Sequence, residues 1–191
     1  MVVDGTGNHL YFADGLEVFG FSIDQTSGTL TPLSGSPFNL PMATLQADST
    51  GQFLLGVTGA DPNVNVIPIG AGTGSLGLPT AFPTVSDPNN LALSANGKFL
   101  FTFAVDSNNR PLPIEGFTFD ATKGMLTTMA NSPFVNLPKV NTGVFDQNGT
   151  VLLGATTTSF FVYSIDSTSG TPTSPLPALG VAHDQRYAIT N

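Results

Sequence analysis

The amino-acid sequence predicts an all-β chain built from about four repeats of a four-stranded antiparallel unit, and three observations support this prediction. A polar turn that ends in glycine and precedes an apolar run recurs every 44 to 52 residues. A second glycine-ended turn follows each copy of the first, 21 to 27 residues later. The segments between the two turns are rich in aromatic and β-branched residues and show no helical periodicity, which is typical of strands.

The two turns mark the repeat because glycine supplies a positive φ angle and aspartate accepts hydrogen bonds from turn amides. The first turn begins at Asp4, Asp48, Ser94 and Asp146 and ends at Gly7, Gly51, Gly97 and Gly149. The second begins at Asp24, Gly70, Asp120 and Asp166 and ends at Gly28, Gly74, Gly124 and Gly170. A Ser-Pro step follows at Ser36-Pro37, Ser132-Pro133 and Ser174-Pro175. We expect the aspartates to hold turns in preference to calcium, since each turn offers one carboxylate.

Two strands are expected between the turns of each unit, at residues 10–13 and 18–23, 53–57 and 64–69, 99–103 and 114–119, and 151–155 and 160–165. Alternate residues of a strand point to the same side of a sheet. Counting back by two from the second turn predicts one buried face per unit. Its members are Phe19, Phe21 and Ile23; Asn65, Ile67 and Ile69; Glu115, Phe117 and Phe119; and Phe161, Tyr163 and Ile165.

One strand before the first turn and one after the second complete a four-stranded unit, at the period expected of the blades of a β-propeller. We therefore expect a single domain over residues 1–191 with blades at 1–39, 40–86, 87–137 and 138–179 and a partial fifth at 180–191. Such a chain would be an open or partial ring. Its incomplete last blade would expose strand edges that invite self-association.

Composition excludes several classes of function. The five cations are scattered singly among thirteen carboxylates, and the net charge is −8, so nucleic-acid binding is not expected. No apolar run reaches the roughly 20 residues of a membrane span. The chain has no cysteine, which excludes disulfides and thiol chemistry. Few lysines with many Ser, Thr, Asn and Gly residues favour an extracellular, periplasmic or cell-envelope protein, and no cofactor is predicted.

Three phrases carry a resemblance to a known family: SIDQTSGTLTPLSGSPF around Asp24, FDATKGMLTTMANSPF around Asp120 and FDQNGTVLLGA around Asp146. The chain resembles the bacterial lactonase-like seven-bladed propellers, the 6-phosphogluconolactonase and YVTN-repeat group. This resemblance implies the fold. The rings of the family have seven blades and this chain holds little more than four, so the alternatives are a fragment of a longer ring and a chain completed by a neighbouring copy. Lactonases of this group place a Pro-Arg-His sequence before a blade-opening strand. The matching steps here are Pro41-Met42-Ala43, Pro88-Asn89-Asn90 and Pro138-Lys139-Val140, which lack the Arg-His pair.

The third unit differs from the others, because a longer loop joins its second and third strands. Loops at this end of a blade share a face with the connections between blades, and such loops often carry function. Arg110 and Glu115 are a candidate cation and carboxylate for a small polar ligand. The alternative is a solvated loop with a surface ion pair and an exposed Glu115. The candidate residues of this loop face are Asp87, Asn89, Asn90, Asp106, Asn108, Arg110, Glu115, Lys139 and Asn141.

His9 and His183 are the two imidazoles of the chain, and they occupy different positions of the repeat. Two separated histidines fall short of the three ligands usual in catalytic zinc sites, so no metal site and no catalytic residue is predicted.

The absent lactonase residues favour a non-catalytic binding or structural module with an unidentified polar ligand or protein partner. One alternative is a lactonase-like hydrolase whose site lies partly outside this segment. Another is a self-assembling subunit whose terminal blade is completed by a neighbouring chain.

Overall fold

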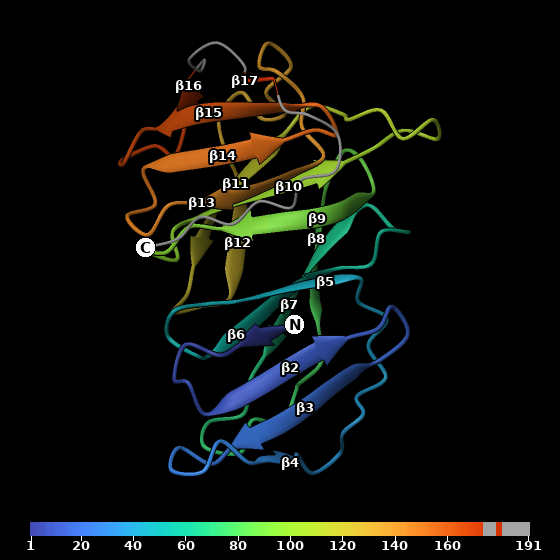
Figure 1. The fold of residues 1–191 in the computed structure, drawn as a ribbon, viewed down its shortest axis with the longest axis vertical. Coiled ribbons are helices and arrows are strands. Elements are labelled where there is room, and N and C mark those ends of the chain that lie inside the picture. The colour runs from blue at the N-terminus through green and yellow to red at the C-terminus, as the bar shows by residue number, and fades with distance from the viewer. Residues whose placement is uncertain (174–178, 181–191) are drawn as a thin grey trace. The chain divides into compact units, whose positions relative to one another are not determined.

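The computed structural model describes residues 1–173 and 179–180, and they form an all-β structure (Figure 1). Strands adjacent in sequence pair antiparallel in four sheets. The fold class predicted from the repeat, a propeller of four-stranded blades, is confirmed. Within the described ranges there is no helix long and apolar enough to cross a membrane. The predictions for Ser174-Pro175, for His183 and for the partial fifth blade at 180–191 concern positions outside the described residues, apart from Gly180.

Each sheet corresponds to one predicted repeat (Figure 1). The first contains β1 (Val2–Val3), β2 (His9–Ala13), β3 (Val18–Ile23) and β4 (Leu30–Pro32). The second contains β5 (Thr44–Ala47), β6 (Phe53–Val57), β7 (Asn63–Pro68) and β8 (Thr80–Pro83). The third contains β9 (Pro88–Leu93), β10 (Phe99–Ala104), β11 (Glu115–Asp120) and β12 (Met125–Thr128). The fourth contains β13 (Thr142–Phe145), β14 (Val151–Ala155), β15 (Ser159–Ile165) and β16 (Pro172–Thr173), and β17 (Leu179–Gly180) pairs with β15.

The chain divides into two compact units. One comprises residues 1–89 and 120–125, and the other comprises residues 90–119 and the described residues from 126 onward. The first and second sheets belong to the first unit, and the fourth sheet belongs to the second. The packing of sheets is therefore described within each unit.

The predicted turn aspartates hold the turns. Asp48 is fully buried, and its Oδ1 accepts from the amides of Gln52 at 2.9 Å and Phe53 at 2.8 Å. Asp146 accepts equivalently from the amides of Thr150 and Val151, each at 2.8 Å. Because a buried amide without a partner is costly, these carboxylates stabilise the start of the second strand in the second and fourth sheets.

The sheets of the first unit pack through opposite faces. We call the face of the first sheet that carries His9, Tyr11, Ala13, Val18 and Gly20 its trailing face, and the opposite face its leading face. The same names are used for the faces that carry the equivalent repeat positions in the other sheets. The trailing face of the first sheet packs on the leading face of the second. Tyr11, Val18 and Leu33 of the first sheet cluster there with Leu45, Leu54, Ile67 and Ile69 of the second.

The same packing joins the sheets of the second unit. Phe99, Phe101, Phe103 and Ile114 lie on the trailing face of the third sheet. They cluster with Leu152, Tyr163 and Ile165 on the leading face of the fourth. The buried face predicted from the sequence is this leading face. The prediction is right for seven of the nine residues in the second, third and fourth sheets, whereas Asn65 and Phe161 are partly exposed.

The prediction is wrong for the first sheet, whose leading face is not buried. Phe19, Phe21 and Ile23 are partly exposed there, and Phe12 on the neighbouring strand is 45% exposed. The buried side of this sheet is the trailing one, where Tyr11 and Val18 are fully covered. The physical reason is that a leading face becomes buried where the trailing face of another sheet packs on it, and the described sheet that packs on the first within this unit covers its trailing face.

Candidate functional site

The predicted loop face lies at one end of the strands of the third sheet, where the loop between β10 and β11 emerges. Because neighbouring strands are antiparallel, the loop between β10 and β11 emerges at the same edge as the start of β9. Asp87 is exposed directly before β9, while Asn89 and Asn90 are its second and third residues. Asp106, Asn108 and Arg110 lie in the loop.

Polar contacts connect the first strands of adjacent sheets on this face. Thr44 in β5 donates its hydroxyl to the Asn89 carbonyl at 3.1 Å. The Asn90 amide nitrogen donates to the Thr142 hydroxyl of β13 at 2.8 Å. Thr44, Asn90 and Thr142 occupy equivalent positions of the repeat. The sequence analysis missed Thr44 and Thr142, although the spacing of the glycine-ended turns aligns them with Asn90.

The third-sheet loop is a tight hairpin organised by the Asp106 carboxylate. Its Oδ1 accepts from the amides of Asn108 and Arg110, both at 2.9 Å. Its Oδ2 accepts from Arg110 Nε at 2.8 Å and lies 2.7 Å from Arg110 Nη2. Asn109 adopts a positive φ angle of 59°, which closes the turn. The hairpin therefore holds the guanidinium in one orientation, while the Arg110 side chain remains 73% exposed.

These hydrogen bonds also determine the acidity of Asp106. The amide and the guanidinium of Arg110 stabilise the carboxylate and lower the pKa of Asp106 below its ordinary value. Asp106 is thereby a weak proton acceptor at neutral pH. The surface ion pair considered for this loop is present, and its acidic member is Asp106.

Glu115 does not lie on the exposed loop face. It is the first residue of β11, is 4% exposed and lies opposite Thr102 in the pairing of β10 with β11. The expectation of an exposed Glu115 is therefore wrong. Glu115 shares the leading face of the third sheet with Leu100, Thr102 and Phe117, which are also buried.

The remaining candidates lie close to β13. Lys139 is exposed in the connection that precedes this strand. Asn141 is partly exposed, and its backbone amide donates to the Ala155 carbonyl at 2.8 Å. In the loop between β6 and β7, Asp61 was not among the predicted candidates. Its Oδ1 is buried and has no hydrogen-bond partner among the described residues.

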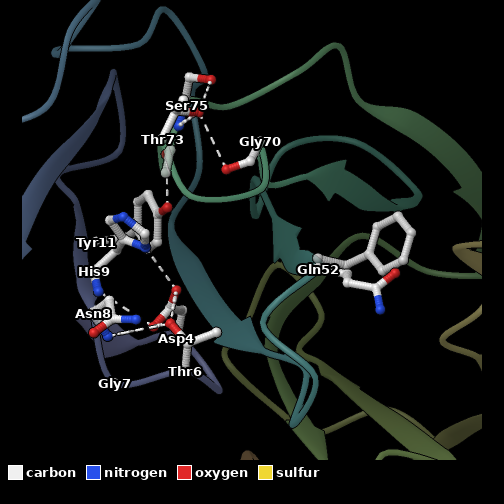
Figure 2. Close-up of polar contacts among 12 residues, drawn as sticks. Asp4, Thr6, Gly7, Asn8, His9, Tyr11, Gln52, Gly70, Thr73 and Ser75 are labelled. Atoms are coloured by element: carbon white, nitrogen blue, oxygen red, sulfur yellow. Dashed lines mark hydrogen bonds and ion pairs between the residues drawn. The ribbon is translucent and has the colours of Figure 1, made fainter.

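A buried acid–imidazole pair lies at the start of β2 in the first sheet, where the side chains of Asp4 and His9 meet (Figure 2). His9 Nδ1 lies 2.8 Å from Asp4 Oδ2. Burial alone would raise the pKa of Asp4, but hydrogen bonds from His9 and Thr6 outweigh it and lower this pKa. The neighbouring Tyr11 hydroxyl donates to the Gly74 carbonyl at 2.7 Å. This hydrogen bond from Tyr11 fastens the first sheet to the turn between β7 and β8.

The structure shows no metal-binding cluster of three or more His, Cys, Asp or Glu residues within the ranges that it describes. The turn acids Asp24 and Asp166 have lowered pKa values because turn amides donate to them. The pKa of Asp120 falls to about 2, chiefly through a hydrogen bond from Lys123. These carboxylates are committed to local structure.

Comparison with known proteins finds relatives in fold. No protein-family model and no curated protein matches the chain. A candidate 6-phosphogluconolactonase from Bacteroides fragilis matches with a TM-score of 0.74 at 18% identity, over 95% of this chain and 54% of that one. The periplasmic gluconolactonase PpgL of Pseudomonas aeruginosa matches with a TM-score of 0.69 at 22% identity, over 93% and 52%. A functionally unknown protein from Desulfotomaculum acetoxidans gives 0.71 at 16%, over 94% and 55%.

The chain spans about half the length of each of these solved structures. The resemblance that the repeated phrases predict is confirmed, and at these identities it is a likeness of fold. The chain has the blade architecture of the lactonase-like β-propellers.

Proposed function

We propose that the chain is a non-catalytic propeller module that binds a polar partner through its loop face. The observation that carries this proposal is the Asp106–Arg110 hairpin. It presents a guanidinium that is fixed by 2.7 and 2.8 Å contacts and is still 73% exposed. A fixed guanidinium loses less conformational entropy on binding than a free one, and its planar N–H groups match carboxylate or phosphate oxygens.

The acidic groups of the described blades support a binding role over a catalytic one. Hydrolysis of a lactone needs a base that takes a proton from water, and such a base works best with a pKa near the working pH. The pKa values of Asp4, Asp106 and Asp146 are all lowered. Each of these carboxylates also accepts hydrogen bonds from backbone amides, and a base would have to release them.

The chemistry of the loop face limits the partner. Arg110 and Lys139 are exposed cations on a chain with a net charge of −8. A long polyanion would be repelled by the rest of the surface, whereas a small carboxylate or phosphate group contacts the hairpin alone. The partner proposed is a small polar anion or a protein that presents a carboxylate. The proposed location is extracellular or periplasmic, supported by the composition and by the description of PpgL as periplasmic.

A lactonase-like hydrolase is the second candidate, because solved relatives in fold include a gluconolactonase and a candidate 6-phosphogluconolactonase. In such an enzyme Arg110 would bind the anionic end of the substrate. Buried Glu115 would have to become accessible, and further catalytic residues would lie outside this chain.

The two candidates are separated by one set of assays on the purified chain. Gluconate and 6-phosphogluconate serve as carboxylate and phosphate probes in titration calorimetry, and the corresponding 1,5-lactones serve as substrates. We expect binding without turnover, and roughly 10- to 150-fold weaker binding for Arg110→Gln, from the loss of about 1.5–3 kcal/mol. Lys123→Gln is the matched control. Lys123 makes an ion pair with Asp120 and is 72% exposed, but it lies at the opposite edge of the third sheet.

Lactone turnover that is abolished by Arg110→Gln and retained by Lys123→Gln would show that the chain is an enzyme. Equal binding of the probes by both variants would show that the hairpin is not the contact surface.

A further inference from the structure

The leading face of the first sheet is entirely apolar and remains partly open to solvent. Phe12, Val3 and Leu30 are each 45% exposed, and Leu10 and Phe21 are partly exposed between them. Strand register places these residues on one face, since Val3 pairs with Leu10 and Ile23 with Leu30. Among the described residues, no charged or hydrogen-bonding side chain interrupts this face. Continuous apolar patches on soluble proteins usually mark interaction surfaces.

Equivalent positions in the later sheets are covered by the preceding blade. Leu54 and Ile67 correspond to Leu10 and Phe21, and both are fully buried against the first sheet. Leu152 and Tyr163 are the counterparts in the fourth sheet, and both are fully buried against the third. The leading face is thus built to receive the trailing face of another blade.

The turn glycines show independently that the later sheets are covered by a preceding sheet and that the first sheet is not. A Cβ atom on Gly74 would lie 2.4 Å from the His9 ring of the first sheet. A Cβ atom on Gly170 would lie 2.5 Å from the Phe99 ring of the third sheet. A Cβ atom on the equivalent Gly28 of the first sheet would have no neighbour within 4 Å among the described residues. Gly28 therefore has room for the side chain that its counterparts already contact.

The complementary surface is the trailing face of the fourth sheet. Val144 is 48% exposed there, and Val151 and Leu153 are partly exposed. Val151 occupies the position of His9 and Phe99, the residues that contact the turn glycine of the following blade. The described side chains of this face are also uncharged. One chain thus carries both halves of the contact that it makes internally between its first and second sheets and between its third and fourth.

We propose that the leading face of the first sheet binds the trailing face of the fourth sheet of a second copy of this chain. The contact is heterologous, because two different surfaces meet, and such contacts either close or propagate. Two copies together have about the length of one solved relative, since this chain spans 54% of the Bacteroides fragilis protein. We therefore expect association to close at two chains. The inference rests on blade packing and is independent of the proposed ligand.

Sedimentation velocity on the purified chain over a range of concentrations tests this proposal. We expect the parent chain to form a reversible dimer. The dissociation constant of the dimer should be at least about 100-fold higher for Phe12→Asp and for Val144→Asp, because each substitution buries an unpaired carboxylate in the contact. Leu78→Asp is the matched control. Leu78 is 89% exposed between β7 and β8 and lies outside both faces. The dissociation constant of the Leu78→Asp dimer should therefore equal that of the parent. Far-ultraviolet circular dichroism verifies that each variant is folded.

Mixing the two disabled variants distinguishes a heterologous contact from a symmetric one. Phe12→Asp chains keep an intact fourth-sheet face, and Val144→Asp chains keep an intact first-sheet face. The mixture should therefore form heterodimers although neither variant dimerises alone. A parent chain that is monomeric at every concentration, a dimer that survives Phe12→Asp, or a mixture that stays monomeric would each overturn the proposal.

Discussion

Replacing Gly74 by alanine should destabilise the fold by an amount that can be worked out from two separate costs. Gly74 has a φ angle of 67°, and an alanine in this left-handed region costs about 1–2 kcal/mol. Its new Cβ atom would lie 2.4 Å from Cδ2 and 2.8 Å from Nε2 of the buried His9 ring. Overpacking of this kind costs about 1–3 kcal/mol. Gly74→Ala should therefore lower the free energy of unfolding by about 2–5 kcal/mol.

Gly28→Ala provides the matched control, because Gly28 has nearly the same φ angle of 71° and a Cβ atom added there would meet no described residue within 4 Å. It should show the backbone cost alone, about 1–2 kcal/mol. The assay is urea unfolding of both variants at a concentration where the chain is monomeric, with the slope of the transition compared to ensure that only stability changes. Equal losses for the two variants would refute the assignment of Gly74 as a contact between the first and second sheets.

Other expectations concern single side chains. Tyr11→Phe and Tyr163→Phe each remove a 2.7 Å hydrogen bond to a backbone carbonyl, so each should cost about 0.5–1.5 kcal/mol in urea unfolding, and unchanged midpoints would contradict this. Asp48→Ala should cost about 1–3 kcal/mol, whereas exposed Ser49→Ala should stay within about 0.5 kcal/mol. Because the folded pKa of Asp4 lies below its ordinary value of 3.8, its stabilisation is present above that pH and is lost as the pH falls through the folded pKa. In Asp4→Asn the free energy of unfolding should therefore decrease less than in the parent as the pH falls below about 4. An equal decrease in both proteins would argue against the Asp4–His9 pair.

The local features of the fold could be predicted from the sequence. A turn aspartate bonds to amides within five residues of itself, as Asp146 does, so a short pattern contains the whole interaction. Strand positions were predicted to within one residue, because alternation and turns delimit them. The predicted first-sheet face failed for the opposite reason. Burial of Phe21 depends on a neighbouring blade, and strand alternation cannot reveal whether that neighbour is present.

The candidate site was predicted in part. The long third-unit loop and its surface ion pair follow from the extra length between turns and from the residues in it. The acidic residue that pairs with Arg110 could not be predicted. The hairpin brings Asp106 to Arg110, whereas Glu115 is buried in the sheet. The contacts of Thr44 with Asn89 and of Asn90 with Thr142 join different repeats. Only the arrangement of adjacent sheets brings these residues together.

Hydroxyl-radical footprinting with mass spectrometry tests most directly the central claim that each leading face is made to be covered by a preceding blade. In dilute solution we expect strong labelling of Phe12 and Phe21, and little labelling of Phe101 and Tyr163, which are fully buried. At concentrations where dimers form, labelling of Phe12 should fall while that of exposed Leu78 stays constant. Phe12 labelled as weakly as Phe101 in the dilute monomer would contradict the account, because the face would already be covered within one chain.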